Sequence, residues 1–230
     1  MSNERIKVIA SGGLKAAYVE LVPMFQRESG KKVETVFAGS ADIMKRVRAG
    51  EAFDLIIMPG TFIDELTGSG KIAAGSRVDL AKSGIGVAVR AGTSKPDISS
   101  GEALERALLA AKSIAYSSSA SGIYLAGLFR RMGIADALEP KIRQSPPGTP
   151  VGDLIARGEV EIGFQQVSEL LPIAGIDYLG PLPPDIQHFT VFAGALHVSA
   201  AGPEGAKALM RFIASPAAAP AIRKSGMEPM

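Results

Sequence analysis

Short runs of β-branched residues alternate with longer amphipathic helical patterns along the whole 230-residue chain. A strand-like run at 6–10 precedes a helical pattern that closes at Ser29-Gly30, and a second strand-like run follows at 32–37. Chains with this alternation form α/β units around mostly parallel sheets, because each helix covers a face of the sheet that its flanking strands build. The pattern predicts an α/β fold and argues against a sandwich or a helical bundle.

Further elements follow in the same order. After a helix around Ile43 and Val47 that stops at Gly50, we expect strands at residues 53–58, 84–89, 113–116, 161–165 and 190–198. We expect helices at residues 64–71, 102–111, 125–132, 151–156, 204–214 and 217–224. The segment 180–184, Gly-Pro-Leu-Pro-Pro, is expected to be a stiff connector.

Charge and composition exclude several classes of function. The 25 basic and 23 acidic side chains leave a net charge of +2 without clusters of like charge, so we expect no nucleic-acid partner. The absence of Cys excludes disulfides, thiolate nucleophiles and iron–sulfur clusters. The two histidines, His188 and His197, lack a metal-binding spacing, so no metal and no cofactor are expected. No run approaches the roughly 18 apolar residues of a membrane span, so we expect no membrane insertion.

Three strand-to-helix turns consist almost wholly of Ser, Gly and Ala, at residues 11–13, 39–41 and 117–122. A helix N-terminus presents unpaired N–H groups and a partial positive charge, and small residues let an anion approach that backbone. Serine is also a common N-cap, and a single turn of this kind is more often a cap than a site. Three such turns together favour a small-anion site beyond the carboxyl ends of the strands.

Catalytic motifs are sparse. The sequence contains no G-x-S-x-G elbow and no phosphate-binding G-x-x-x-x-G-K-[ST] loop, so a hydrolase or a kinase finds little support. The candidates for proton transfer are His188, Tyr124 and Glu169, and Arg77 is a candidate carboxylate clamp. We favour His188 as the catalytic candidate, because it follows the proline-rich connector at residues 180–184.

Several segments, in this order, resemble the type II periplasmic-binding-protein fold, and within it the molybdate-binding proteins of ABC importers. They are A-S-G-G-L from Ala10, F-Q-R-E-S-G-K-K-V from Phe25, F-A-G-S-A-D from Phe37, R-A-G-E-A-F-D-L from Arg48, G-E-V-E-I-G-F-Q-Q from Gly158 and A-K-A-L-M-R-F-I-A-S-P from Ala206. The resemblance covers essentially the whole chain.

This resemblance implies two doubly wound α/β lobes joined by two crossover strands, with a ligand held in the cleft between them and closure by hinge motion. Lobe one would comprise residues 1–83 plus 193–230, and lobe two residues 84–192. By matching position, the groups that hold the oxyanion would be Ser11, Gly12, Ser40 and Ala41 from lobe one, and Ser119, Ser121 and Val151 from lobe two.

One position departs from the molybdate-binding pattern. Where those proteins carry a tyrosine that donates to the oxyanion, this chain has Gln165-Gln166. A planar amide both donates and accepts hydrogen bonds, which suits a carboxylate or a hydroxyl better than a fully deprotonated tetrahedral oxyanion. The stretch from Ser76 through Gly92, together with the later G-F-Q-Q-V-S-E-L from Gly163, is similar to a divergent subgroup that includes aconitate isomerases, which are enzymes on a solute-binding fold.

The sequence therefore favours a solute-binding protein for a small anion, a di- or tricarboxylate. One alternative is a cofactor-independent isomerase or tautomerase of an unsaturated carboxylic acid on the same fold. A second alternative is molybdate or tungstate binding. A regulatory effector domain would need an attached DNA-binding helix-turn-helix, for which the chain has no spare residues.

The expected localisation and partners follow from the same resemblance. The chain enters its first strand directly, which predicts a cytoplasmic protein as written, or a periplasmic one with an ABC permease as partner if a leader has been removed. An importer component needs export to meet its permease, so the cytoplasmic alternative favours the isomerase. We expect a monomer that binds a small-molecule anion.

Overall fold

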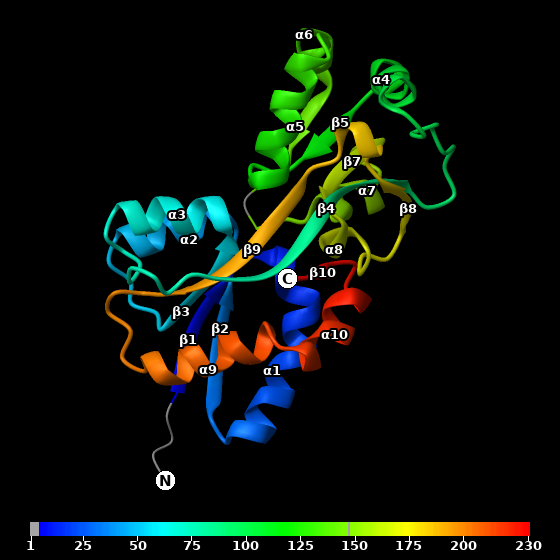
Figure 1. Cartoon of the computed structure of the whole chain (residues 1–230). Coiled ribbons are helices and arrows are strands. Elements are labelled where there is room, and N and C mark those ends of the chain that lie inside the picture. The colour runs from blue at the N-terminus through cyan, green and yellow to red at the C-terminus, as the bar shows by residue number, and fades with distance from the viewer. Residues whose placement is uncertain (1–4, 147) are drawn as a thin grey trace. The chain divides into compact units, whose positions relative to one another are not determined.

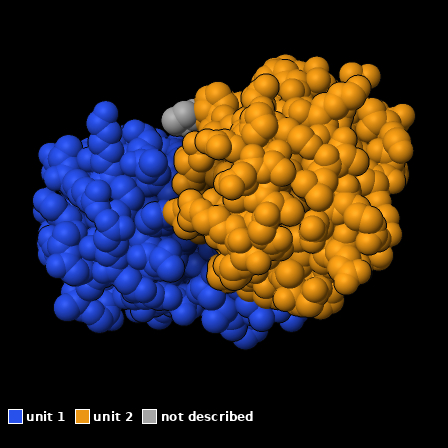
Figure 2. Space-filling model, turned by 90° about the horizontal axis from the view of Figure 1, so that it is seen from above, with its two compact units in different colours: residues 1–83, 190–230 blue, residues 84–189 orange. Residues whose placement is uncertain are grey.

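The computed structural model describes residues 5–146 and 148–230 and divides into two compact units. Unit 1 comprises Met1–Ser83 and Thr190–Met230, and unit 2 comprises Gly84–Phe189 (Figure 2). The chain passes from one unit to the other along two strands, β4 (Val78–Arg90) and β9 (Phe189–Leu196). The second boundary lies at residues 189/190, whereas the sequence placed it at 192/193.

Unit 1 is built around a sheet in which β2, β1, β3 and β9 are neighbours in that order. Strands β1 (Arg5–Ala10), β2 (Lys32–Phe37) and β3 (Leu55–Pro59) are parallel, and β9 is antiparallel to β3. The short strand β10 (Glu228–Pro229) pairs with β4. The carboxyl ends of β1, β2 and β3 therefore lie at one edge of this sheet.

Helices cover both faces of the unit 1 sheet (Figure 1). Along β1, Val8 belongs to one buried apolar cluster and Ile9 to another, because successive side chains of a strand point to opposite faces. The first cluster includes residues of α1 (Lys15–Ser29), α9 (Pro203–Ile213) and α10 (Ala219–Lys224). The second includes residues of α2 (Ser40–Arg48) and α3 (Gly60–Gly68).

Unit 2 has the same design. Strand β5 (Ile114–Tyr116) lies between β6 (Ile142–Gln144) and β7 (Ile162–Gln166), and all three are parallel. Strand β4 is antiparallel to both β7 and β8 (Ile176–Pro181). One face is covered by α4 (Gly101–Ala110), α5 (Ala120–Arg131) and α6 (Ala135–Leu138), and the other by α7 (Val151–Ala156) and α8 (Val167–Leu170).

Most elements confirm the sequence prediction, and the α/β class is confirmed. The predicted connector over 180–184 is wrong at its start, because Gly180 and Pro181 end β8. Strand β4 begins at Val78, six residues before the predicted Gly84. Within the described residues, no helix is both long and apolar enough to cross a membrane.

Candidate anion-binding site

The first two Ser/Gly/Ala turns begin side by side in unit 1. Ala10 pairs with Phe37 on one side and with Ile57 on the other, so the three strands end together. The Ser11 N–H then donates to the Ile57 carbonyl at 2.8 Å, and the Ala38 N–H donates to the Ala10 carbonyl at 3.1 Å. These bonds fix the turns at residues 11–13 and 38–41, which we call the unit 1 turns, at the edge where open α/β sheets bind ligands.

Ser11 carries a hydroxyl group without a partner. The residue is 4% exposed, and its Oγ is buried with no hydrogen bond in the described part of the chain. Ser11 precedes the short 3-10 helix Gly12–Leu14, yet its side chain makes no capping bond. Buried polar groups nearly always have a partner, and leaving one unpaired costs about 1–3 kcal/mol. The role of a simple N-cap therefore does not explain this hydroxyl.

The second unit 1 turn leaves a helix start uncapped. Gly39 is the N-cap of α2 and offers no side-chain oxygen to the first N–H groups of that helix. Ser40, the first helical residue, is 4% exposed, and Ala41 beside it is exposed. The nine-residue helix thus presents N–H groups beside a buried serine, which suits an anion.

The ring of Phe192 leaves no room for a side chain at Gly13. Phe192 of β9 lies opposite Pro59 at the end of β3, and a Cβ built on Gly13 would lie 2.1 Å from the Phe192 Cζ atom. The ring therefore occupies the space beside the first turn. This contact lets the ring pack directly against the backbone of the Ser11 turn, and no local sequence pattern predicts it.

The third turn occupies the equivalent edge of unit 2. Tyr116 at the end of β5 pairs with Gln144 and Phe164, so β5, β6 and β7 also end together. Residues 117–119 follow β5, residues 145 and 146 follow β6, and α8 follows β7 directly.

Ser121 repeats the feature of Ser11. The residue is 1% exposed, and its Oγ is buried without a hydrogen bond in the described chain. Ser119, the N-cap of α5, makes no side-chain capping bond, and its N–H donates to Ser117 Oγ at 3.3 Å. A Cβ on Gly122 would lie 1.6 Å from the Ser117 carbonyl oxygen, so only glycine allows the turn to fold this tightly onto the helix.

The end of β7 brings three predicted or candidate residues together. Gln165 is 5% exposed, and its Oε1 accepts a 2.8 Å hydrogen bond from the Val151 N–H. The side chain of Gln165 also bonds the Glu169 carboxyl. Burial raises the pKa of Glu169 to about 7, and the bond from Gln165 opposes that rise. Val151 was predicted to offer its N–H to an anion, but here Gln165 occupies that N–H.

Gln166 points to the other face of β7. It is 2% exposed and lies opposite Ile85 of β4. Successive residues of a strand face opposite sides, so Gln165 and Gln166 cannot serve the same face of this sheet. The side-chain amides of Gln165 and Gln166, which the sequence analysis treats as one pair, therefore lie on opposite faces of the sheet.

His188 and Tyr124 form a separate pair in unit 2. Their rings stack at 4.5 Å with an angle of 12° between them, and the Tyr124 hydroxyl donates to the Ile186 carbonyl at 2.9 Å. His188 as a whole is exposed. Its ring is partly covered, and this partial desolvation lowers the pKa of His188. The Tyr124 hydroxyl is thus engaged, and the role predicted for His188 stays a prediction.

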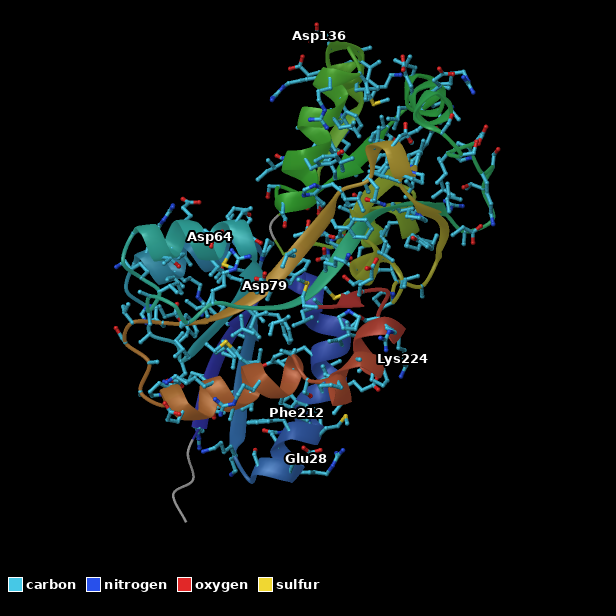
Figure 3. All side chains as sticks on the ribbon, viewed as in Figure 1. Glu28, Asp64, Asp79, Asp136, Phe212 and Lys224 are labelled. Atoms are coloured by element: carbon cyan, nitrogen blue, oxygen red, sulfur yellow. The ribbon has the colours of Figure 1, made fainter. Side chains whose placement is uncertain are left out.

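Arg77 is compensated within unit 1. Its guanidinium bonds Asp64 at 2.6 Å and Asp79 at 2.8 Å, from α3 and β4 (both carboxylates are labelled in Figure 3). These two ion pairs raise the pKa of Arg77. They also oppose the prediction that Arg77 is a free carboxylate clamp, because two carboxylates already satisfy it.

No described group of three or more His, Asp or Glu residues could hold a metal ion. A cavity of about 510 Å³ lies at the amino ends of β1 and β2, where Arg5, Gln26 and Lys32 contribute to its lining. That position is at the opposite end of these parallel strands from the unit 1 turns. Arg5 there bonds Glu34 at 2.6 Å, so we do not assign the anion to this cavity.

Comparison with known proteins places the chain in a family. A family model described as bacterial extracellular solute-binding protein matches residues 6–228. The chain is 41% identical to an aconitate isomerase from a Pseudomonas species over 98% of its length and 88% of that protein. It is 24% identical to the molybdate-binding protein ModA of Escherichia coli, over 96% of this chain and 88% of ModA.

Solved structures show the same fold. The sulfate-binding protein SubI of Mycobacterium tuberculosis superposes with a TM-score of 0.84 at 18% identity, covering 99% of this chain and 87% of SubI. The periplasmic molybdate-binding protein of Azotobacter vinelandii gives a TM-score of 0.77 at 20% identity, covering 96% and 98% of the two chains. The chain belongs to the bacterial extracellular solute-binding proteins, in the type II periplasmic-binding branch that includes ModA.

Proposed function

We propose that this protein binds a di- or tricarboxylate and isomerises an unsaturated one, as an aconitate-isomerase-like enzyme on a solute-binding fold. The observation that carries the proposal is the 41% identity, over 98% of the chain, to a protein named aconitate isomerase. The 24% identity to ModA is much lower over a similar length, which favours the carboxylate over molybdate.

The donor groups of both units support a carboxylate ligand. Among the described residues, Ser11 and Ser121 each hold a buried hydroxyl without a partner, and α2 begins with N–H groups that no side chain caps. Carboxylate oxygens accept hydrogen bonds from hydroxyl and N–H groups, and such charge-assisted bonds are stronger than bonds between neutral groups. Neutral donors at helix starts thus bind an anion without a compensating arginine.

The proposed reaction moves a double bond. A proton leaves the methylene carbon next to one carboxylate, the double bond shifts by one position, and a proton returns to the carbon at the former far end of the double bond. One C–H bond breaks and one forms, so the reaction balances without an oxidant, a reductant or a cofactor. Positioned acid–base groups accelerate such steps by about 10²–10⁴-fold.

A second candidate is a carrier that binds the same anion without turnover and delivers it to an ABC permease. Membership in the bacterial extracellular solute-binding family favours this candidate. Binding of molybdate or tungstate is the corresponding alternative for the ligand, supported by the similarity to ModA.

A thermal-shift screen separates these candidates, because a ligand that binds the native state raises the melting temperature. We would compare cis-aconitate, trans-aconitate, citrate, molybdate, tungstate, sulfate and phosphate. Each carboxylate that shifts the protein would then be incubated with catalytic amounts of it and followed by NMR. Stabilisation with turnover supports the isomerase, stabilisation without turnover supports the carrier, and stabilisation by molybdate alone contradicts both carboxylate proposals.

A further inference from the structure

Glu169 is held in a defined orientation at the end of β7. The strand ends at Gln166, and the one-turn helix α8 that follows carries Glu169. Because Gln165 Oε1 accepts from the Val151 N–H at 2.8 Å, the amide nitrogen of Gln165 remains to donate to the Glu169 carboxyl. The Val151 N–H thus orients the amide of Gln165, and that amide in turn orients the carboxyl group of Glu169.

Glu169 is half-buried as a residue, and its carboxyl group lies in a position that disfavours ionisation. Burial disfavours its ionised form and raises the pKa of Glu169 to about 7. A glutamine at 169 has the same shape and could bond Gln165 without placing a charge in a desolvated position. An acid kept near half-ionisation at neutral pH, within a hydrogen-bonded cluster, is typical of a group that transfers protons.

Other charged groups do not account for this environment. Helix α8 packs against α7 and β7, and its Leu170 shares an apolar cluster with Ala88 of β4, against which Tyr178 of β8 packs. The titratable residues on these neighbours include Asp153 of α7 and Tyr178, whereas β7 carries none. Burial and Gln165 are the causes of the altered pKa of Glu169, and Asp153 is not among them. His188, by comparison, is exposed and stacks on Tyr124, and no hydrogen bond orients its ring within the described chain.

We propose that Glu169 takes and returns the proton in the isomerisation and that Gln165 positions its carboxylate. The inference rests on the function proposed above. In the first step the Glu169 carboxylate removes a proton from the methylene carbon next to a substrate carboxylate, so an O–H bond forms as the C–H bond breaks. The electron pair delocalises into the unsaturated acid as a dienolate.

In the second step the Glu169 acid, whose O–H exchanges with solvent, delivers a proton to the far carbon of the former double bond. The second C–H bond forms, the double bond settles one position along, and Glu169 is a carboxylate again. Because the first step needs the carboxylate, the rate should rise with pH through about 7 and then level off.

The test compares Glu169→Gln with Glu139→Gln, an equal substitution at an exposed glutamate of unit 2. Each full-length protein is given trans-aconitate in D2O, and NMR follows both isomerisation and the loss of the methylene proton signal. Calorimetry measures trans-aconitate binding. We expect Glu169→Gln to lose at least 100-fold in both rates and to bind within about threefold of wild type. Glu139→Gln should match wild type.

The outcomes distinguish the inference from the proposed function. Wild-type turnover with an unimpaired Glu169→Gln overturns the proton-transfer role alone. Absence of wild-type turnover overturns the proposed function and this inference with it. If Glu169→Gln does not fold, Glu169→Asp and the wild-type pH profile decide: a rate independent of pH from 5 to 9, or an Asp variant as fast as wild type, contradicts the role.

Discussion

Gln165 Oε1 accepts a 2.8 Å hydrogen bond from the backbone N–H of Val151, fourteen residues earlier in the chain. The bond joins the first turn of α7 to the end of β7. Gly163 supports the same contact, because a Cβ there would lie 2.8 Å from Val151 Cγ1. Helix α7 can therefore approach the strand closely enough for the Gln165 side chain to reach its backbone.

Replacing Gln165 with methionine should destabilise the protein and alter Glu169. The buried Val151 N–H would lose its partner, which costs about 1–3 kcal/mol in the free energy of unfolding. The pKa of Glu169 should rise further, because the bond from Gln165 lowers it. Urea unfolding measures the first effect, and the pH dependence of the rate measures the second. Gln144→Met, at an exposed position of β6, is the control and should change neither.

Glu169→Gln should stabilise the protein at neutral pH while removing turnover. The pKa of Glu169 is about 7 in the folded protein, against 4.5 as its ordinary value. Its contribution to stability is therefore fully present below pH 4.5 and is lost as the pH rises to about 7. Each unit of pKa difference corresponds to about 1.4 kcal/mol, so the loss is about 3 kcal/mol at most.

Melting temperatures of wild type and Glu169→Gln across pH 4 to 9 test this prediction. The difference in favour of the variant should grow between pH 4.5 and 7 and stay constant above. A difference that is constant over the whole range would show that the carboxyl group of Glu169 is not in a desolvated position.

Ser11→Ala and Ser121→Ala should weaken ligand binding without weakening the fold. Each hydroxyl is buried and has no partner in the part of the chain that the structure describes, so its removal should leave the free energy of unfolding of the ligand-free protein unchanged or slightly higher. A hydrogen bond to a charged ligand contributes about 1.5–3 kcal/mol, which corresponds to roughly a 10- to 150-fold loss of affinity.

Calorimetry with trans-aconitate measures that loss, and Ser94→Ala, in an exposed loop of unit 2, is the matched control. If Ser11→Ala alone loses affinity, only the unit 1 hydroxyl binds the ligand. Unchanged affinity in both variants would remove these hydroxyls from the binding site.

Gly13→Ala should disturb the first turn, because the new methyl group would lie about 2 Å from the Phe192 ring. Overpacking of this kind costs about 1–3 kcal/mol. Gly68→Ala at the end of α3, where a Cβ meets nothing within 4 Å, should be tolerated. Adding Phe192→Leu to Gly13→Ala should restore part of the stability in thermal unfolding. A Gly13→Ala variant as stable as wild type would show that the ring can move aside.

The unit 1 turns could be predicted from the sequence because their signal is local. Alternating strand and helix patterns locate the carboxyl ends of β1 and β2, and the small residues that follow stand out there. The same local signals predicted a connector where β8 ends and no strand before it, since Gly180 and Pro181 are typical of turns but end a strand here. A proline is tolerated there because β8 is an edge strand that pairs with β4, so its missing N–H takes no bond from the ladder.

The contacts of Gln165 and Arg77 depend on tertiary structure. The sequence marked Gln165, Val151 and Glu169 separately, but only the pairing of β7 with its neighbours brings them together. Likewise, the guanidinium of Arg77 bonds Asp64, thirteen residues earlier, and Asp79, and the sequence alone does not show these contacts. The types of side chain at these positions can be read from the sequence, whereas the residues that they contact cannot.

The most direct test of the central claim is an NMR time course of trans-aconitate in D2O with catalytic amounts of the wild-type protein at pH 8. Our account predicts conversion to the cis isomer together with exchange of the methylene protons for deuterium, until equilibrium is reached. An unchanged spectrum would contradict our account. The contradiction would be complete if molybdate raised the melting temperature of the same protein and aconitate did not.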